Sequence, residues 1–125
     1  MNVDQAIREA EELLPGEPVA EGVDPRWQAI IKIGDFIEAE PEAGWPFIER
    51  WGSHSDSDLR DAIATCLLEH LLEHHFDAYF PRVELAVESH SSFGNCFSRC
   101  WPFGQSDSPA NRPRFDRLKR VVAAV

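Results

Sequence analysis

Apolar side chains recur three and four positions apart along most of the chain, which is the spacing of one face of an α-helix. The first pattern starts near Val3 and ends at Pro15-Gly16, two residues that interrupt helices. The second follows Asp24 and Pro25, which suit the N-cap and the first helical position. A third, shorter pattern covers about 45–51. The spacing therefore predicts three helices before the midpoint of the chain.

The strongest pattern runs from about Ser57 to Phe76 and follows capping residues at 55–58. Its apolar face is so broad that this helix is expected to be central and packed on more than one side. Pro81 is expected to open a fifth helix that ends near His90. Residues 82–88 also alternate like a strand, but a helix is preferred because Pro81 suits a first turn and no partner strand is evident.

Residues 91–112 show no regular spacing of apolar positions, so one long irregular loop is expected there. A last helix is predicted to begin at Pro113. Its inward-facing residues are Phe115, Leu118, Val121, Val122 and Val125. Together the patterns predict an all-α protein of about six helices. Short connections favour antiparallel hairpins, and the chain length favours a single helical domain over 1–125.

The element order allows two successive hairpins to stack as in a short helical-repeat array, although the sequence has no repeat of fixed period. The stretch from Arg60 to Ala64 and from Leu67 to Phe76, preceded by 45–52, resembles the helices of small, uncharacterised bacterial proteins with HEAT-like hairpins. Some acidic proteins of this type are immunity proteins that neutralise toxins. The resemblance covers about 45–80 and implies a fold class, but it assigns no functional residue.

The charge is strongly acidic and unevenly distributed. The chain has 22 acidic and 12 basic side chains and a formal charge of −10, which disfavours nucleic acid and anionic lipid as partners. Residues 1–49 hold 12 acids and 3 bases, residues 50–90 hold 8 and 3, and residues 91–125 hold 2 and 6. Either the basic C-terminal helix docks on the acidic body, or an acidic face stays open to a basic partner.

The expected compartment is the cytoplasm. The N-terminus lacks the basic and apolar regions of a signal peptide, and no apolar run is long enough to span a membrane. The three cysteines, Cys66, Cys96 and Cys100, are an odd number, which fits poorly with a secreted disulfide scaffold.

Residues 70–74 read His-Leu-Leu-Glu-His, which matches the H-x-x-E-H arrangement of inverted zincins. His70 and His74 share a helix face, so both imidazoles could hold zinc while Glu73 activates the bound water. They also share the sector of the apolar residues, so partial burial is expected. Inverted-zincin peptidases are large and need a third ligand, which no residue here marks out. Histidines bonded to backbone or carboxylate across a helix interface are therefore the preferred interpretation.

The segment from Phe93 to Gly104 combines four aromatic side chains with an arginine inside the expected loop. Aromatic residues and arginine are typical of the anchors of protein interfaces. The candidate partner-binding residues are Phe97, Arg99, Trp101 and Phe103.

Cys96 and Cys100 lie in the same segment with C-x3-C spacing. A zinc site is possible, but C-x2-C is the commoner arrangement and no second cysteine pair exists. Buried free thiols are preferred over a metal site or a redox pair, and nothing specific supports a cysteine–histidine nucleophile.

No complete catalytic or cofactor-binding motif is present, so an enzyme is not the favoured class. We therefore expect an acidic cytoplasmic protein-binding module, for example an immunity-type inhibitor of a basic effector. Acidic residues would steer the partner, and Trp101 or Phe97 would anchor it. The alternative is a small zinc protein, structural or hydrolytic, built on His70 and His74 with Cys96 and Cys100. A helical subunit of a larger complex also fits, and the sequence leaves the oligomeric state open.

Overall fold

Helices make up most of the computed structural model, which describes residues 1–19 and 21–124. The α-helices are α1 (Val3–Leu13), α2 (Pro25–Ile37), α3 (Pro41–Gly52), α4 (Ser57–Ile63), α5 (Glu69–Ser89), α6 (Ser91–Ser98) and α7 (Arg112–Ala123). A π-helical turn, η1 (Ala64–Leu68), joins α4 to α5, and a 3₁₀ turn, η2 (Gly104–Asp107), precedes α7. The described residues contain no strand, so the predicted all-α class is confirmed and 82–88 is helical.

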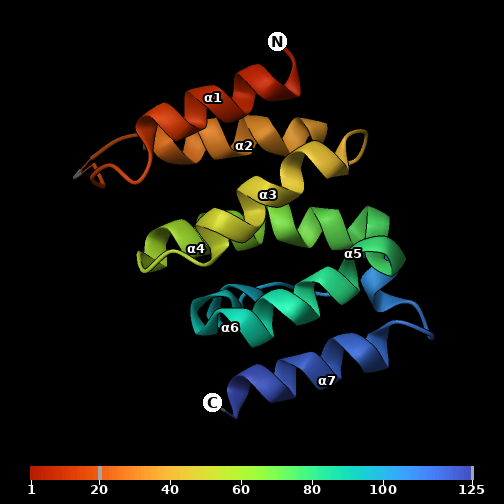
Figure 1. The fold of residues 1–125 in the computed structure, drawn as a ribbon. Coiled ribbons are helices and arrows are strands. Elements are labelled where there is room, and N and C mark those ends of the chain that lie inside the picture. Colours follow the sequence, from red (N-terminus) through yellow and green to blue (C-terminus); the bar gives the residue numbers. More distant parts are fainter. Residues whose placement is uncertain (20, 125) are drawn as a thin grey trace.

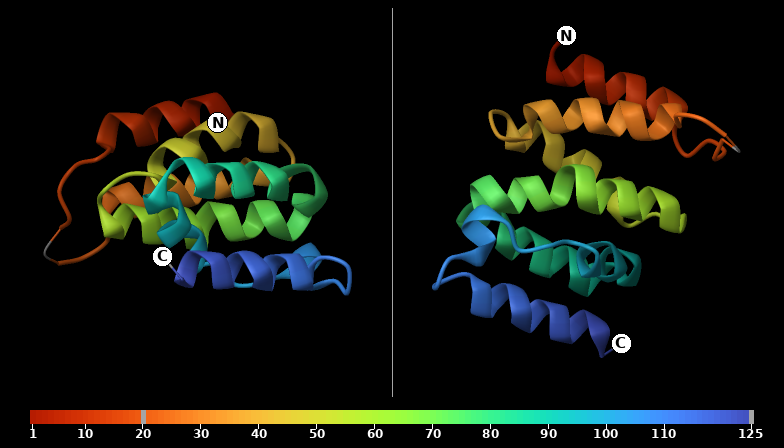
Figure 2. Two further views of the ribbon diagram at one scale, coloured as in Figure 1. Left: turned by 60° about the horizontal axis from the view of Figure 1, so that its bottom comes forward. Right: turned by 180° about the vertical axis from the view of Figure 1, so that it is seen from behind.

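The helices form a stack with α1 at one end and α7 at the other (Figure 1). The opposite view of the ribbon shows the same order (Figure 2). Along the stack α1 packs on α2, α2 packs on α3 and η1, and α6 lies against both α5 and α7. The HEAT-like arrangement of hairpins stays a prediction. No helix among the described residues is long and apolar enough to cross a membrane.

Local capping explains where several helices begin. Asp24 caps α2 by accepting from the backbone N–H of Arg26, and Pro25 occupies the first turn as predicted. Asp56 caps α4 by accepting from two backbone N–H groups of the first turn. At α1, Asn2 and Gln5 form a reciprocal capping box. These caps use residues within three positions of one another, so the sequence alone marks them.

Three predicted boundaries are wrong. Helix α3 begins at Pro41, because this proline opens the helix several residues before the apolar pattern does. Pro81 lies inside α5, which resumes its helical course directly after a kink at His75. The expected loop over 91–112 contains α6 and η2. Helix α6 exists because its apolar side chains lie three and four positions apart and are buried, namely Phe93, Cys96 and Phe97.

The helix predicted over 57–76 is present, but the π-helical turn η1 changes its orientation. This turn holds one residue more than an α-helical turn, which rotates the residues after it. The fully buried face therefore passes from Leu59 and Ile63 to Leu72 and Phe76. The expected partial burial is met by His74, whose side chain is 36% exposed, whereas the side chain of His70 is 48% exposed.

Aromatic side chains hold the C-terminal half together. Phe76 and Phe80 of α5 are stacked with ring centroids 4.4 Å apart. Phe80 meets Phe97 of α6 at 6.1 Å, and Phe97 meets Phe115 of α7 at 5.0 Å. All four side chains are almost completely buried, so α5, α6 and α7 share one core. Of the other predicted inward-facing residues of α7, Leu118 is buried and Val121 is half exposed, while Val125 lies outside the described residues.

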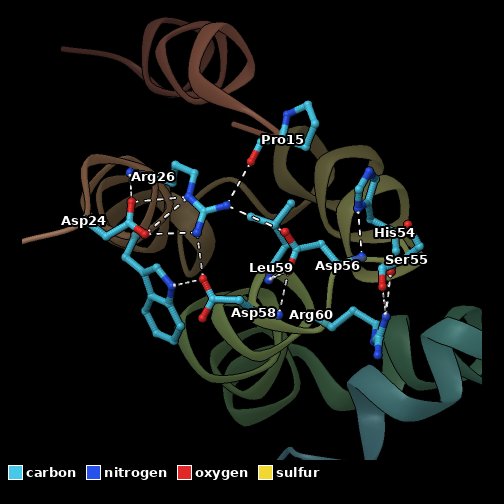
Figure 3. Close-up of polar contacts among 10 residues, drawn as sticks. Pro15, Asp24, Arg26, His54, Ser55, Asp56, Asp58, Leu59 and Arg60 are labelled. Carbon is cyan, nitrogen blue, oxygen red and sulfur yellow. Dashed lines mark hydrogen bonds and ion pairs between the residues drawn. The ribbon is translucent and has the colours of Figure 1, made fainter. Parts of the chain in front are cut away.

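Arg26 joins three segments in the N-terminal half of the chain (Figure 3). It is only 3% exposed, and its guanidinium contacts Asp24 at 3.0 Å, Asp58 at 2.8 Å and Asp56 at 3.7 Å. It also donates to the carbonyl of Pro15 at 2.9 Å. One buried cation therefore connects the N-termini of α2 and α4 with the turn that follows α1.

We expect Arg26→Met to destabilise the fold by about 3–5 kcal/mol, because it leaves three carboxylates without the buried cation that pairs them. Urea unfolding followed by circular dichroism measures the change. Lys32→Met is the matched control, because Lys32 is exposed and only 3.9 Å from Glu9, and it should cost less than about 1 kcal/mol. Equal losses for the two variants would contradict a structural role of Arg26.

Asp24→Asn tests the charge of the same cluster while retaining an N-cap. The side-chain hydrogen bond from Arg26 lowers the pKa of Asp24 below its usual 3.8. Its contribution is thus fully present above that usual value and is lost as the pH falls through the lowered pKa. We expect a loss of about 1–3 kcal/mol near neutral pH, measured by urea unfolding across acid pH. A difference from wild type that did not shrink at low pH would contradict this.

Candidate functional site

The segment between α6 and η2, 99–103, exposes two large aromatic side chains. Trp101 is 67% exposed and Phe103 is 47% exposed, and both line a groove beside α7. Phe97, by contrast, is completely buried between α5 and α7. Its predicted role in partner binding is therefore wrong, because α6 turns this ring into the core.

A buried carboxylate and a half-buried ammonium group hold the exposed segment in place. A Glu69 carboxylate oxygen accepts from the backbone N–H of Trp101 at 2.9 Å, and Glu69 is only 6% exposed. The Lys119 ammonium donates to the carbonyls of Ser98 and Cys100. Burial raises the pKa of Glu69 and lowers the pKa of Lys119. The segment that carries Trp101 is thus fixed on both sides by side chains from α5 and α7.

Gln105 fixes the following turn to a break in α5. The backbone of His75 is non-helical, with φ −137° and ψ 45°, so the helical ladder is interrupted there. The Gln105 side-chain amide donates to the carbonyl of His74 at 2.7 Å and accepts from the N–H of Phe76 at 2.9 Å. One side chain therefore satisfies both groups at the kink. These partners lie far apart in the sequence, so no local sequence pattern indicates the interaction.

Gly104 lets the chain approach α5 closely enough for this contact. Its φ is +52°, in the left-handed region that favours glycine. A Cβ at this position would lie 2.6 Å from Cγ of Glu73 and 2.8 Å from its carbonyl oxygen. The segment with the exposed aromatics and the helix with the histidines are therefore packed together.

A cleft of about 490 Å³ lies between α2 and the η1–α5 segment. It is lined by Ile31, Gly34, Asp35, Glu38, Thr65, Cys66, His70 and His74. On its α5 side, Glu73 Oε1 lies 3.1 Å from Nδ1 of His70 and 3.6 Å from Nε2 of His74. Nδ1 of His74 also lies 3.8 Å from the Glu38 carboxylate of α2. His70 is therefore bonded to a carboxylate of its own helix, and only His74 approaches a carboxylate, that of Glu38, across the helix interface that the preferred interpretation expects.

The donors at the predicted zinc positions do not fit a zinc site. No group of three or more His, Cys, Asp or Glu among the described residues is arranged to hold a metal ion. The thiol of Cys96 donates to the carbonyl of Arg60 in α4, and the thiol of Cys100 donates to the carbonyl of Ala64 in η1. Burial raises the pKa of Cys96 to about 12, and that of Cys100 also rises. His70, His74, Cys96 and Cys100 are therefore not gathered into one ligand cluster in this structure.

Neither Cys66 nor Glu73 has the surroundings of a catalytic group. Burial raises the pKa of the half-buried Cys66 thiol, whereas a nucleophilic cysteine needs a lowered one. The Glu73 carboxylate is occupied by the two imidazoles of its own helix.

Three arginines of the C-terminal part are paired, one with nearby aspartates and two with acids of preceding helices. Arg112 contacts Asp107 and Asp116, and Arg99 pairs with Asp61. Among the described residues, no ion pair links α7 with an acid of 1–49. The ion pair from α7 to the acidic body is instead that of Arg114 with Glu84 of α5, at 3.7 Å.

No family model, curated protein or solved structure matches the chain. The fold and the site define an all-α protein with a fixed aromatic segment and a polar cleft on neighbouring sides of α5.

Gln105→Ala is expected to destabilise the protein by about 1–3 kcal/mol, because it leaves a backbone donor and a backbone acceptor unpaired at the kink of α5. Gln28→Ala is the control, since Gln28 is an exposed residue of α2. Urea unfolding gives the stability change, and amide hydrogen exchange at Phe76 reports the local opening. Unchanged protection of the Phe76 amide would contradict the role assigned to Gln105.

Proposed function

We propose that this chain is a protein-binding module that captures a partner with a basic surface, as an immunity-type inhibitor of a basic effector would. The observation that carries the proposal is the pair of exposed aromatic side chains, Trp101 and Phe103, on a segment held from both sides. Exposed tryptophan is costly in water and dominates many protein interfaces. The proposal assigns no catalytic residue.

The fixed backbone at 99–105 supports binding because little conformational freedom is lost on association. Glu69, Lys119 and Gln105 already hold this segment in one conformation. An anchor that is ordered before binding avoids part of the entropy cost of forming an interface. Trp101 and Phe103 are therefore presented as a preorganised apolar contact.

The charge distribution supports a basic partner. Arg99 and Arg112, the arginines beside the anchor, are each paired with nearby aspartates, so they do not dominate the local field. Residues 1–49 hold 12 acids and 3 bases, and the acids on the outer side of α1 and α2 are exposed. Such a field would steer a basic protein towards the module. The cytoplasm is the compartment we propose, and the three free cysteines support it.

Capture from a lysate of the source cell tests the proposal, with bound proteins identified by mass spectrometry. We expect the wild type to recover a basic protein at low salt and less of it at moderate salt, because screening weakens steering. The double variant Trp101→Ala/Phe103→Ala should lose at least about 90% of the recovery, as expected for the removal of two anchor side chains.

Leu85→Ala is the matched control, because Leu85 is a 62% exposed apolar residue of α5 outside the anchor groove. Its recovery should equal that of the wild type. Failure to recover any protein partner at either salt concentration would contradict the proposed function. Full recovery by the double variant would contradict the role of the anchor.

A further inference from the structure

The cleft between α2 and the η1–α5 segment is the second binding feature of the molecule. We propose that it receives an arginine or lysine side chain of the basic partner. This inference rests on the proposed function and adds to it the chemistry of one contact. It is carried by the shape and lining of the cleft, both of which suit a long aliphatic side chain with a cationic end.

The α2 wall of the cleft matches such a side chain along its length. Ile31, Asp35 and Glu38 follow one another at spacings of four and three residues, so they lie on one face of the helix. Ile31 is 43% exposed and offers an apolar surface for the methylene groups. Asp35 and Glu38 then offer carboxylates for the charged end, and the Glu38 side chain is 74% exposed. Along this wall the apolar residue therefore comes first and the two acidic residues follow it.

The described residues of the opposite wall contribute a hydroxyl and two imidazoles but no lysine or arginine. Thr65 and Cys66 come from the π-helical turn, and His70 and His74 come from the first turns of α5. None of the described residues that line the cleft is lysine or arginine. Single π-helical turns inside α-helices often occur at functional sites. Here the turn places the hydroxyl of Thr65 and the two imidazoles opposite the acidic residues of α2.

The floor of the cleft is closely packed. A Cβ on Gly34 would lie 3.0 Å from the carbonyl oxygen of Cys66, so α2 and η1 are in direct contact there. The cleft therefore exists before a partner arrives. A preformed cleft loses less free energy to reorganisation than one that must open.

The same partner can reach the cleft and the aromatic anchor. Glu73 lies between them: its backbone and Cγ pack against Gly104 of the anchor side, and its carboxylate contacts His70 and His74 of the cleft. Glu73 of α5 therefore contacts both the cleft and the segment that carries the anchor. A basic protein that covers Trp101 could place a cationic side chain across this helix.

N-acetyl-arginine amide, titrated into isotope-labelled protein and followed by NMR, tests the inference without the partner. We expect saturable shifts centred on Gly34, Thr65 and His70, and none with the uncharged N-acetyl-citrulline amide. Asp35→Asn/Glu38→Gln should weaken binding at least about fivefold. The matched control is Glu9→Gln/Glu12→Gln, which removes two charges at the same spacing from a groove on α1. It should leave binding unchanged.

Several results would overturn the cleft assignment while leaving the proposed function intact. These are shifts spread over the whole acidic surface, equal weakening by both double variants, or binding of zinc chloride but not of the arginine probe. The NMR spectrum of each variant serves as the check that it is folded. Partner capture by Asp35→Asn/Glu38→Gln separates the two ideas further. Capture reduced with Trp101 present supports the cleft, whereas capture unchanged overturns it and leaves the anchor as the main contact.

Discussion

The buried guanidinium of Arg26 is the interaction on which the arrangement of the N-terminal helices depends. It brings three aspartates from the starts of α2 and α4 to one point and also binds the carbonyl of Pro15. This fixes α2 against α4 at one end, and the contact of Gly34 with Cys66 fixes it again farther along. That second contact forms the floor of the cleft. Its walls therefore keep their separation because α2 is held at two places.

The parts of the fold that depend on neighbouring residues could be predicted from the sequence, and those that depend on distant ones could not. Asp24 and Pro25 mark the start of α2 because capping needs only the next residues. Helix α6 was not predicted because the helical spacing of Phe93, Cys96 and Phe97 covers little more than one turn, which leaves 91–112 without a regular pattern. The contacts of Gln105 with His74 and Phe76 join positions 31 and 29 residues apart. No local pattern contains them.

In the candidate site, too, features set by neighbouring residues could be predicted from the sequence and features set by distant residues could not. Exposure of Trp101 and Phe103 agrees with the expectation that aromatic residues of this segment face outward, whereas Phe97 required knowledge of α6 to be placed in the core. The spacing of His70 and His74 suggested a common ligand on a buried face. A single extra residue in η1 rotates both towards the cleft and its carboxylates. A helical wheel assumes uniform turns, so it fails beyond a π-helical turn.

Glu69 and Lys119 show that the position of the aromatic segment has a cost in stability. Both lose hydration, which raises the pKa of one and lowers the pKa of the other, and such buried charges rarely stabilise a fold more than apolar residues would. Apolar side chains at these positions would leave the N–H of Trp101 and the carbonyls of Ser98 and Cys100 without these partners. The segment could then adopt other conformations. We therefore attribute the two charges to the orientation of Trp101, because their hydrogen bonds hold the backbone that carries this side chain.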